Sequence, residues 1–146
     1  MSHQSPRPTI YRTPICPERV RTIGSDSFAF VPHRFLRHGF FATLTMDERG
    51  LYFFLVLAAD RHGVSFYHYD TICSVLQLPL EGYLAARHGL LHKDLIAFDG
   101  TRFQVLALPQ QPLPAGGGAL RTTADFADHD PATIRGLIQR SLPPRS

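Results

Sequence analysis

Proline and glycine are concentrated towards the two ends of this chain, and the stretch between those ends has a regular apolar pattern. Residues 1–24 contain four prolines, and residues 109–129 contain three prolines and the run Gly116-Gly117-Gly118. Such segments lack the periodicity that marks helices and strands, so they predict an extended arm and a flexible linker. We expect one folded domain over residues 25–108, and a separate C-terminal helix and tail over residues 130–146.

The first half of the domain predicts helices. A short apolar lead-in precedes a short helix in which Phe35 and Leu36 face inward. Thr45 and Glu48 have the spacing of a capping box, in which each side chain bonds the other residue's backbone N–H group. This box predicts the start of a strongly apolar helix that runs to about residue 60.

The second half of the domain mixes two helices with short strands. Asp70 is expected to cap the first of these helices and Pro79 to begin the second. The dipeptide Asp99-Gly100 is the strongest short-range signal for a two-residue β-hairpin. The expected order is a strand at 64–67, a helix after residue 70, a turn at 77–78, a helix at 79–93, and strands at 95–98 and 103–108.

This order of elements carries a family resemblance. It rests on residues 30–36, 44–60, 69–78 and 94–98 with the hairpin that follows. Together these stretches resemble bacterial winged helix-turn-helix proteins, which include transcriptional regulators and related modules of replication initiators and mobile elements. The resemblance implies an α+β fold, mainly helical, with a short β-hairpin wing. It also implies sequence-specific binding to double-stranded DNA.

In that family the helix after the turn lies in the DNA major groove and reads base edges. Carried onto this chain, it is the helix at 79–93, in which helical spacing turns Tyr83, Ala86 and Leu90 toward the core. The outer faces are then expected to hold Leu80, Glu81, Leu84, Ala85, Arg87, His88, Leu91 and His92.

Arg87 and His88 are the best candidates on this helix for contacts to bases or phosphates. Lys93 is a candidate phosphate contact or a charge partner at the helix C-terminus. Glu81 would repel phosphate but can accept a hydrogen bond from a cytosine amino group. Leu80 and Leu84 suit contact with a protein partner better than contact with DNA. The alternative is therefore a winged helix that binds another protein and makes no direct DNA contact.

The basic excess of the chain, +3 overall, lies in its leading arm. Residues 1–24 hold four arginines against one glutamate, whereas residues 25–108 hold seven basic and eight acidic residues. Arg12, Arg19 and Arg21 in this arm are interleaved with prolines, as in extended arms that track a minor groove. A solvated tail without that role is the alternative.

Three further arginines are candidates for phosphate contact. Arg102 lies beside the expected Asp99-Gly100 turn and could reach a phosphate or enter the minor groove. Arg34 and Arg37 lie on the first short helix and could touch the DNA backbone. For all three, an ordinary solvated arginine is the alternative.

Catalytic and metal sites are not indicated. The glycine run at 116–118 lacks the Lys-Ser/Thr of a phosphate-binding loop, and no serine sits in a nucleophile elbow. Cys73 fits a helical core. His88 and His92 are one helical turn apart, but no carboxylate or thiol is placed to complete a metal site with them. We expect no enzyme activity, no cofactor and no metal.

Cellular context and partners follow from the remaining features. Two distant cysteines form no disulfide framework, which favours a reducing compartment. The most apolar stretch, 51–59, is far shorter than the roughly 18 residues of a membrane span. We expect a cytoplasmic protein, associated with the nucleoid when bound to DNA. The C-terminal helix, which Asp130 would cap, carries Ile134, Leu137 and Ile138 on one face and is the expected contact of a homodimer.

Overall fold

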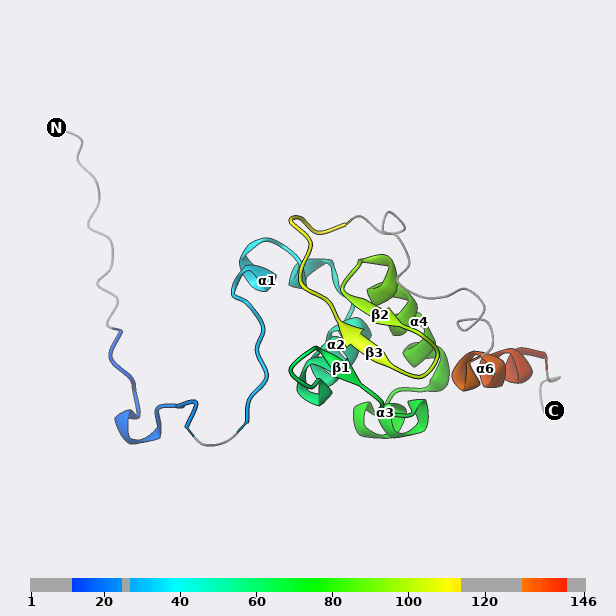
Figure 1. The fold of residues 1–146 in the computed structure, drawn as a ribbon, viewed down its shortest axis with the longest axis horizontal. Helices are drawn as coiled ribbons and strands as arrows, with labels where there is room; N and C mark the ends of the chain where they lie inside the picture. Colours follow the sequence, from blue (N-terminus) through cyan, green and yellow to red (C-terminus); the bar gives the residue numbers. More distant parts are fainter. Residues whose placement is uncertain (1–11, 25–26, 114–129, 142–146) are drawn as a thin grey trace.

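The computed structural model describes residues 12–24, 27–113 and 130–141. Within these residues, the helices α2 (Met46–Ala58), α3 (Tyr69–Leu76) and α4 (Leu80–His92) pack beside an antiparallel sheet (Figure 1). The sheet consists of β1 (Val64–Ser65), β2 (Ile96–Phe98) and β3 (Phe103–Val105) in the order β1-β3-β2. The fold is α+β, as the sequence predicts. The shorter elements are η1 (Pro17–Arg19), α1 (Arg34–Arg37) and η2 (Phe41–Thr43). α6 (Pro131–Ser141) packs against α4.

The capping box at the start of α2 is confirmed. The Glu48 backbone N–H donates to Thr45 Oγ1 at 3.2 Å, and the Thr45 N–H donates to Glu48 Oε1 at 2.7 Å. These two bonds satisfy backbone donors that a helix start otherwise leaves open. The helix ends at Ala58, two residues before the predicted end.

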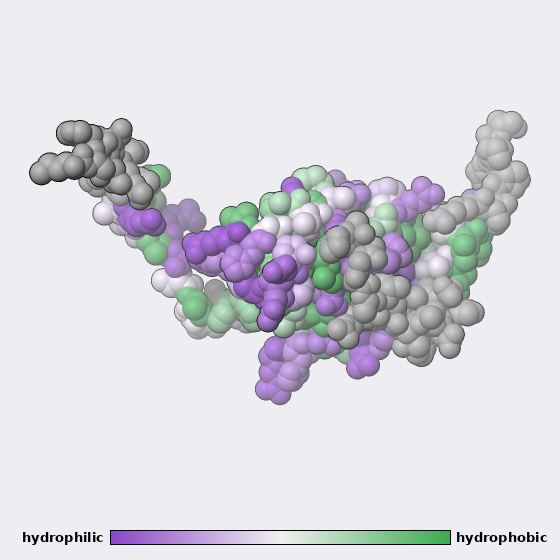
Figure 2. Space-filling view, turned by 90° about the horizontal axis from the view of Figure 1, so that it is seen from above, coloured by the Kyte–Doolittle hydropathy of each residue, from purple (hydrophilic) through white to green (hydrophobic). Residues whose placement is uncertain are grey.

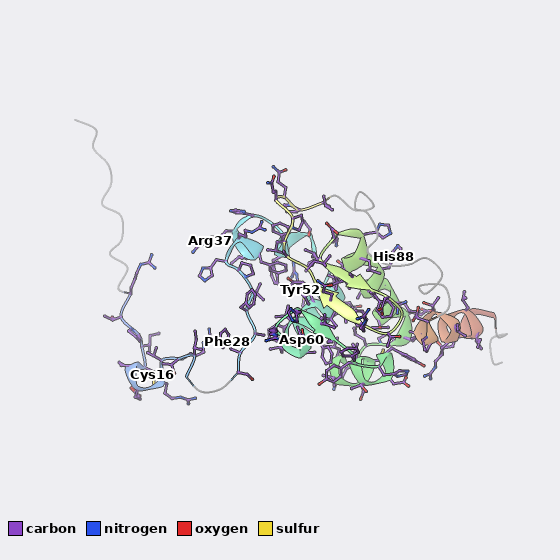
Figure 3. The ribbon with its side chains drawn as sticks, in the orientation of Figure 1. Cys16, Phe28, Arg37, Tyr52, Asp60 and His88 are labelled. Atoms are coloured by element: carbon purple, nitrogen blue, oxygen red, sulfur yellow. The ribbon has the colours of Figure 1, made fainter. Side chains whose placement is uncertain are left out.

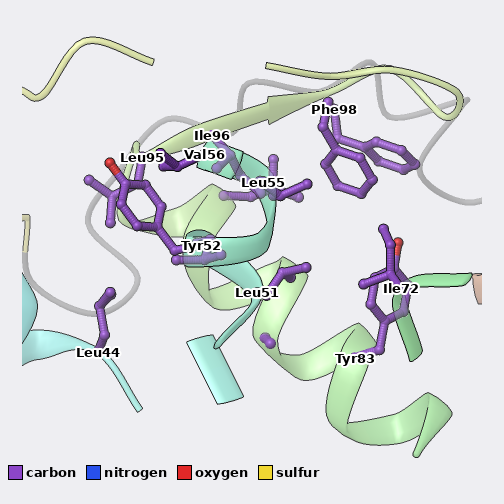
Figure 4. Close-up of a cluster of buried hydrophobic side chains, with 14 of the residues drawn as sticks. Leu44, Leu51, Tyr52, Leu55, Val56, Ile72, Tyr83, Leu95, Ile96 and Phe98 are labelled. Carbon is purple, nitrogen blue, oxygen red and sulfur yellow. The ribbon is translucent and has the colours of Figure 1, made fainter. Parts of the chain in front are cut away.

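The core lies between α2, α4 and the sheet. Leu51 and Leu55 of α2 and Leu90 of α4 are fully buried, and Tyr83 is 1% exposed. Figure 4 shows α2 side chains facing Tyr83 of α4 on one side and Ile96 of β2 on another. Burying large apolar side chains of this kind stabilises a fold by about 1.5–3 kcal/mol each. This apolar layer fixes how α4 is rotated about its axis, and hence which of its residues face outward.

The turn between α3 and α4 is confirmed, whereas the cap of α3 differs from the prediction. Gln77 adopts a left-handed conformation with φ of 53°, and the Leu78 N–H donates to the Cys73 carbonyl at 3.0 Å. These features end α3 and turn the chain toward α4. The N-cap of α3 is His68, whose Nδ1 accepts from the Asp70 N–H at 3.4 Å. Asp70 lies inside the first turn instead of capping it.

The β2–β3 hairpin turns one residue later than predicted. Phe98 pairs with Phe103, as the predicted strand limits imply, and the Asp99 N–H donates to the Arg102 carbonyl at 3.2 Å, so the two residues inside this bond are Gly100 and Thr101, not Asp99 and Gly100. The Asp99 carboxylate accepts from the Thr101 and Arg102 N–H groups at 3.0 and 2.6 Å and stabilises this turn. β3 also pairs with β1, which covers only two of the four residues predicted for that strand.

The described chain before α1 lies outside the core, whereas Phe35, Phe40 and Leu44 belong to it. Phe35 of α1 is buried as expected, but Leu36 is 69% exposed, so its inward orientation is wrong. α1 spans only four residues, and one turn of helix can direct few side chains into the core. Residues 12–24 are exposed throughout. Residues 1–11, most of the predicted linker (114–129) and residues 142–146 lie outside the described residues.

α6 begins where the sequence places it. The Asp130 carboxylate accepts from the Ala132 and Thr133 N–H groups at 3.2 and 3.4 Å, which confirms the predicted cap. Ala132 is buried, and the helix contacts α4. None of the helices in the described part of the chain has the length and apolar character that crossing a membrane requires.

Candidate nucleic-acid interface

α4 is the helix that the resemblance assigns to DNA. Its core face is as predicted, with Tyr83, Ala86 and Leu90 buried. Three of the expected outer residues, Glu81, Ala85 and His88, are exposed and follow one side of the helix at helical spacing. We call these three residues the α4 stripe. Leu80, Leu84 and His92 are half-buried. Leu91 is 5% exposed and belongs to the core, so its outer placement is wrong.

Arg87 does not lie on an outer face, and this prediction is wrong. Its side chain is 8% exposed, and its guanidinium makes a two-pronged ion pair with Asp130, at 2.8 and 2.9 Å. It also donates to Thr133 Oγ1 at 2.8 Å and lies 4.6 Å from the centre of the Phe98 ring. The planar guanidinium matches a carboxylate with two parallel bonds, which makes this pair specific in geometry.

The same contact places α6 over part of α4. A methyl group on Gly136 of α6 would lie 2.8 Å from Leu84 Cδ1, so the two helices approach closely there. Burial raises the pKa of Asp130, but the hydrogen bonds from Arg87 and Thr133 outweigh it and hold that pKa below its ordinary value. Arg87 and Leu84 therefore form the contact between α4 and α6, where Arg87 is buried and Leu84 is half-buried.

Lys93 is also held by the protein itself. Its Nζ lies 2.6 Å from Glu48 Oε1 and donates to the Thr43 carbonyl at 2.8 Å, and its side chain is 12% exposed. A methyl group at Gly89 would overlap the Glu48 carboxylate, so only glycine allows this acid to approach α4. Lys93 is thus a charge partner of a buried acid near the end of α4 and not an exposed phosphate contact.

The two arginines of α1 differ. Arg34 is half-buried and donates to the carbonyl groups of Leu108 and Pro109 at 2.7 and 2.8 Å. It therefore fastens the chain after β3 to α1 and is not a solvated face residue. Arg37 is exposed. Figure 3 places Arg37 and His88 at opposite sides of the domain, so the two do not form one compact patch.

The hairpin and the arm keep exposed arginines. Arg102 Nε lies 2.9 Å from Asp99 Oδ2, yet its side chain is 60% exposed. This arrangement leaves part of the guanidinium open at the tip of the hairpin. Arg12, Arg19 and Arg21 are exposed along the arm. Figure 1 shows this arm extending away from the body of the domain, so these charges are separate from those of the hairpin.

His88 and His92 lie together as their spacing predicts, with ring centres 4.2 Å apart. Burial lowers the pKa of His88, and the neighbouring His92 and Arg87 lower it further, so His88 is neutral at pH 7. Among the described residues, no group of three potential ligands could hold a metal ion. The exposed His88 can offer a hydrogen-bond donor and an acceptor to a partner, whereas Nδ1 of His92 is buried.

Sequence reasoning missed that Asp130 and Glu48 neutralise two of the candidate cations. Asp130 was recognised only as a helix cap, and Glu48 only as part of the capping box. The small residue Gly89 opposite Glu48 was the one local sign of a close approach. Comparisons with family models, with curated proteins and with solved structures found no match for this chain.

Proposed function

We propose that this chain binds double-stranded DNA through a winged helix domain. It would act as a small transcriptional regulator, or as an accessory factor of replication or of a mobile element. The observation that carries the proposal is the order α3, turn, α4 and β2–β3 hairpin, with β1 beside β3. This order is what the resemblance to winged helix-turn-helix proteins implies.

The exposed arginines would supply most of the affinity. Arg12, Arg19 and Arg21 of the arm, Arg37 of α1 and Arg102 of the hairpin are all exposed. Each arginine that neutralises a phosphate releases counterions, and this release makes the affinity depend steeply on salt. Arg87, Lys93 and Arg34 have no part in this proposal, because each is held by contacts within the protein.

The α4 stripe would supply base contacts. Glu81 can accept a hydrogen bond from a cytosine amino group, and the neutral imidazole of His88 can both donate and accept. Ala85 between them offers an apolar contact that suits a thymine methyl group. The exposed side of α4 therefore offers a few base contacts, and none of them comes from an arginine.

The test is the binding of the full chain to DNA flanking its own gene and to random duplex DNA. We expect the flanking DNA to be preferred by about 10³-fold. Glu81→Ala and His88→Ala should each reduce this preference, by roughly 1–3 kcal/mol for a lost base contact. The control is Arg61→Ala, an exposed arginine outside the proposed surface. Equal affinity for both duplexes would contradict sequence-specific binding.

A protein-interaction module is the second candidate. α4 already packs against one helix, α6, where Leu84 lies close to Gly136, so contact with a helix is one that this side of α4 can make. In this case the domain would bind a protein partner and not DNA. Absence of binding to either duplex at low salt would favour this function.

A further inference from the structure

The segment that joins the arm to α1 is apolar and exposed. Phe28 is 64% exposed and Phe30 is 77% exposed, and Val31 beside them is 38% exposed. Residues 27–32 form neither helix nor strand. In an extended chain, residues two apart lie on the same side, so the two phenyl rings can form one apolar edge. We call residues 27–31 the aromatic segment.

A second exposed apolar surface runs along α2. Met46, Phe53 and Leu57 are 74%, 61% and 60% exposed. Positions 46, 50, 53 and 57 lie on one face of a helix, so these three side chains lie on the same side of α2 and are here called the α2 row. Gly50 lies between Met46 and Phe53, and an added methyl group there would only reach Leu76 of α3 at 3.9 Å.

The aromatic segment does not cover the α2 row of its own chain, since both are exposed. The point at which the aromatic segment leaves the domain is fixed by α1, where Phe35 is buried and Arg34 donates to two carbonyl groups. Only Pro32 and His33 separate the segment from α1, and proline restricts the backbone on both sides of itself. The segment runs away from the body of the domain, and Figure 2 shows hydrophobic residues on this projecting arm.

We infer that the aromatic segment of each chain docks on the α2 row of a second copy, so that two chains exchange arms in a symmetric dimer. Phe28 and Phe30 would lie about 6.7 Å apart along an extended chain. Phe53 and Leu57 are about 6 Å apart along the helix axis, so one phenyl ring can meet each turn. Each chain gives one segment and receives another, which closes the assembly.

The area available matches a modest but specific interface. Three side chains of the segment and three of the row expose roughly 100 Å² each. Covering them in both chains would bury about 1,200 Å², near the lower limit for specific interfaces. The segment would dock through side chains and not as an added strand on β1. There the Asp60 N–H donates to the Val64 carbonyl at 2.9 Å, and the Val64 N–H donates to Asp60 Oδ1 at 3.0 Å.

The test is the mass of the full chain in solution, measured by sedimentation equilibrium from low to high micromolar concentrations. We expect a dimer for the natural sequence. Phe28→Ser with Phe30→Ser, and separately Phe53→Ser with Leu57→Ser, should each yield monomers. All four side chains are exposed, so each variant should stay folded, with the far-ultraviolet circular dichroism of the natural chain. The control is Val75→Ser, an equally exposed apolar residue on α3, which should leave the dimer intact.

Mixing the two double variants gives the sharpest result. The first retains an intact α2 row and the second an intact aromatic segment, so one of the two contacts can form. We expect the mixture to contain a heterodimer that is weaker than the natural dimer, although neither variant associates alone. A monomer at every concentration, a dimer that survives both double variants, or a mixture without heterodimer would each overturn the inference. The assay contains no DNA, so its outcome is independent of the DNA-binding proposal.

Discussion

Asp130→Ala should detach α6 from the domain. The Asp130 and Arg87 side chains are 2% and 8% exposed, and two bonds of 2.8 and 2.9 Å join them. Removing one partner of such a pair costs about 3–5 kcal/mol, because the remaining charge is left buried and uncompensated. The substitution also removes the cap of α6, which contributes about 1 kcal/mol more.

The response should be local, because α6 has few other attachments. It has 11 residues, and isolated helices of this length are marginal in water. Ala132 is buried, Leu84 packs beside Gly136, and Arg135 lies 3.3 Å from Asp70. These few contacts do not compensate for a buried, unpaired Arg87 charge, which costs about 3–5 kcal/mol. Releasing α6 lets water hydrate Arg87 and is therefore more favourable than keeping the unpaired charge buried.

The assay is native-state hydrogen exchange of the backbone amides, resolved by peptide. In Asp130→Ala, amides of α6 should exchange freely while those of α2 and α4 stay protected. Adding Arg87→Met removes the unpaired charge, so the double variant should regain part of the α6 protection. The reasoning is refuted if α6 in Asp130→Ala is as protected as in the natural chain, or if the double variant is no better protected than the single one.

Further predictions concern acid, alkali, the contact of Gly89 in α4 with Glu48, and the start of α2. The pKa of Asp130 is held below its ordinary value of 3.8. The stabilisation of docked α6 by this carboxylate is therefore complete above pH 3.8 and is lost as pH falls through the lowered pKa. Helical circular dichroism during an acid titration checks this. Burial raises the pKa of Tyr83 from 10.0 to about 12, so ultraviolet titration should find this phenol neutral at pH 11, and stability should fall as pH rises toward 12. Gly89→Ala displaces the buried Glu48 carboxylate and should destabilise the fold by about 1–3 kcal/mol in urea unfolding. Thr45→Ala removes one bond of the capping box and should cost about 1 kcal/mol in the same assay.

Features that depend on neighbouring residues were predictable from the sequence. The box of Thr45 and Glu48 and the core face of α4, with Tyr83 and Leu90, follow from caps and from helical period. The turn at residues 77–78 follows from the interruption of that period before Pro79. Each rests on residues a few positions apart, whose relation the backbone geometry determines.

The candidate site was predictable only in part, because its cations have distant partners. Arg87 pairs with a residue 43 positions away, and Lys93 with one 45 positions away. Arg34 bonds carbonyl groups 74 and 75 positions away. No local pattern contains these pairings, so each cation was expected to be exposed. The hairpin turn lies one residue later than expected because Asp99 bonds Arg102 through its N–H and its carboxylate, which a dipeptide signal does not show.

The measurement that tests the central claim most directly is the salt dependence of binding of the full chain to duplex DNA. Each phosphate contact contributes about 0.9 to the slope of log affinity against log salt. Removing Arg12, Arg19 and Arg21 together should therefore lower the slope by roughly 3 and weaken binding on all sequences alike. Replacing Arg61 alone, outside the proposed surface, should leave the slope unchanged. No binding at low salt, or a slope that is the same after the triple substitution, would contradict the account.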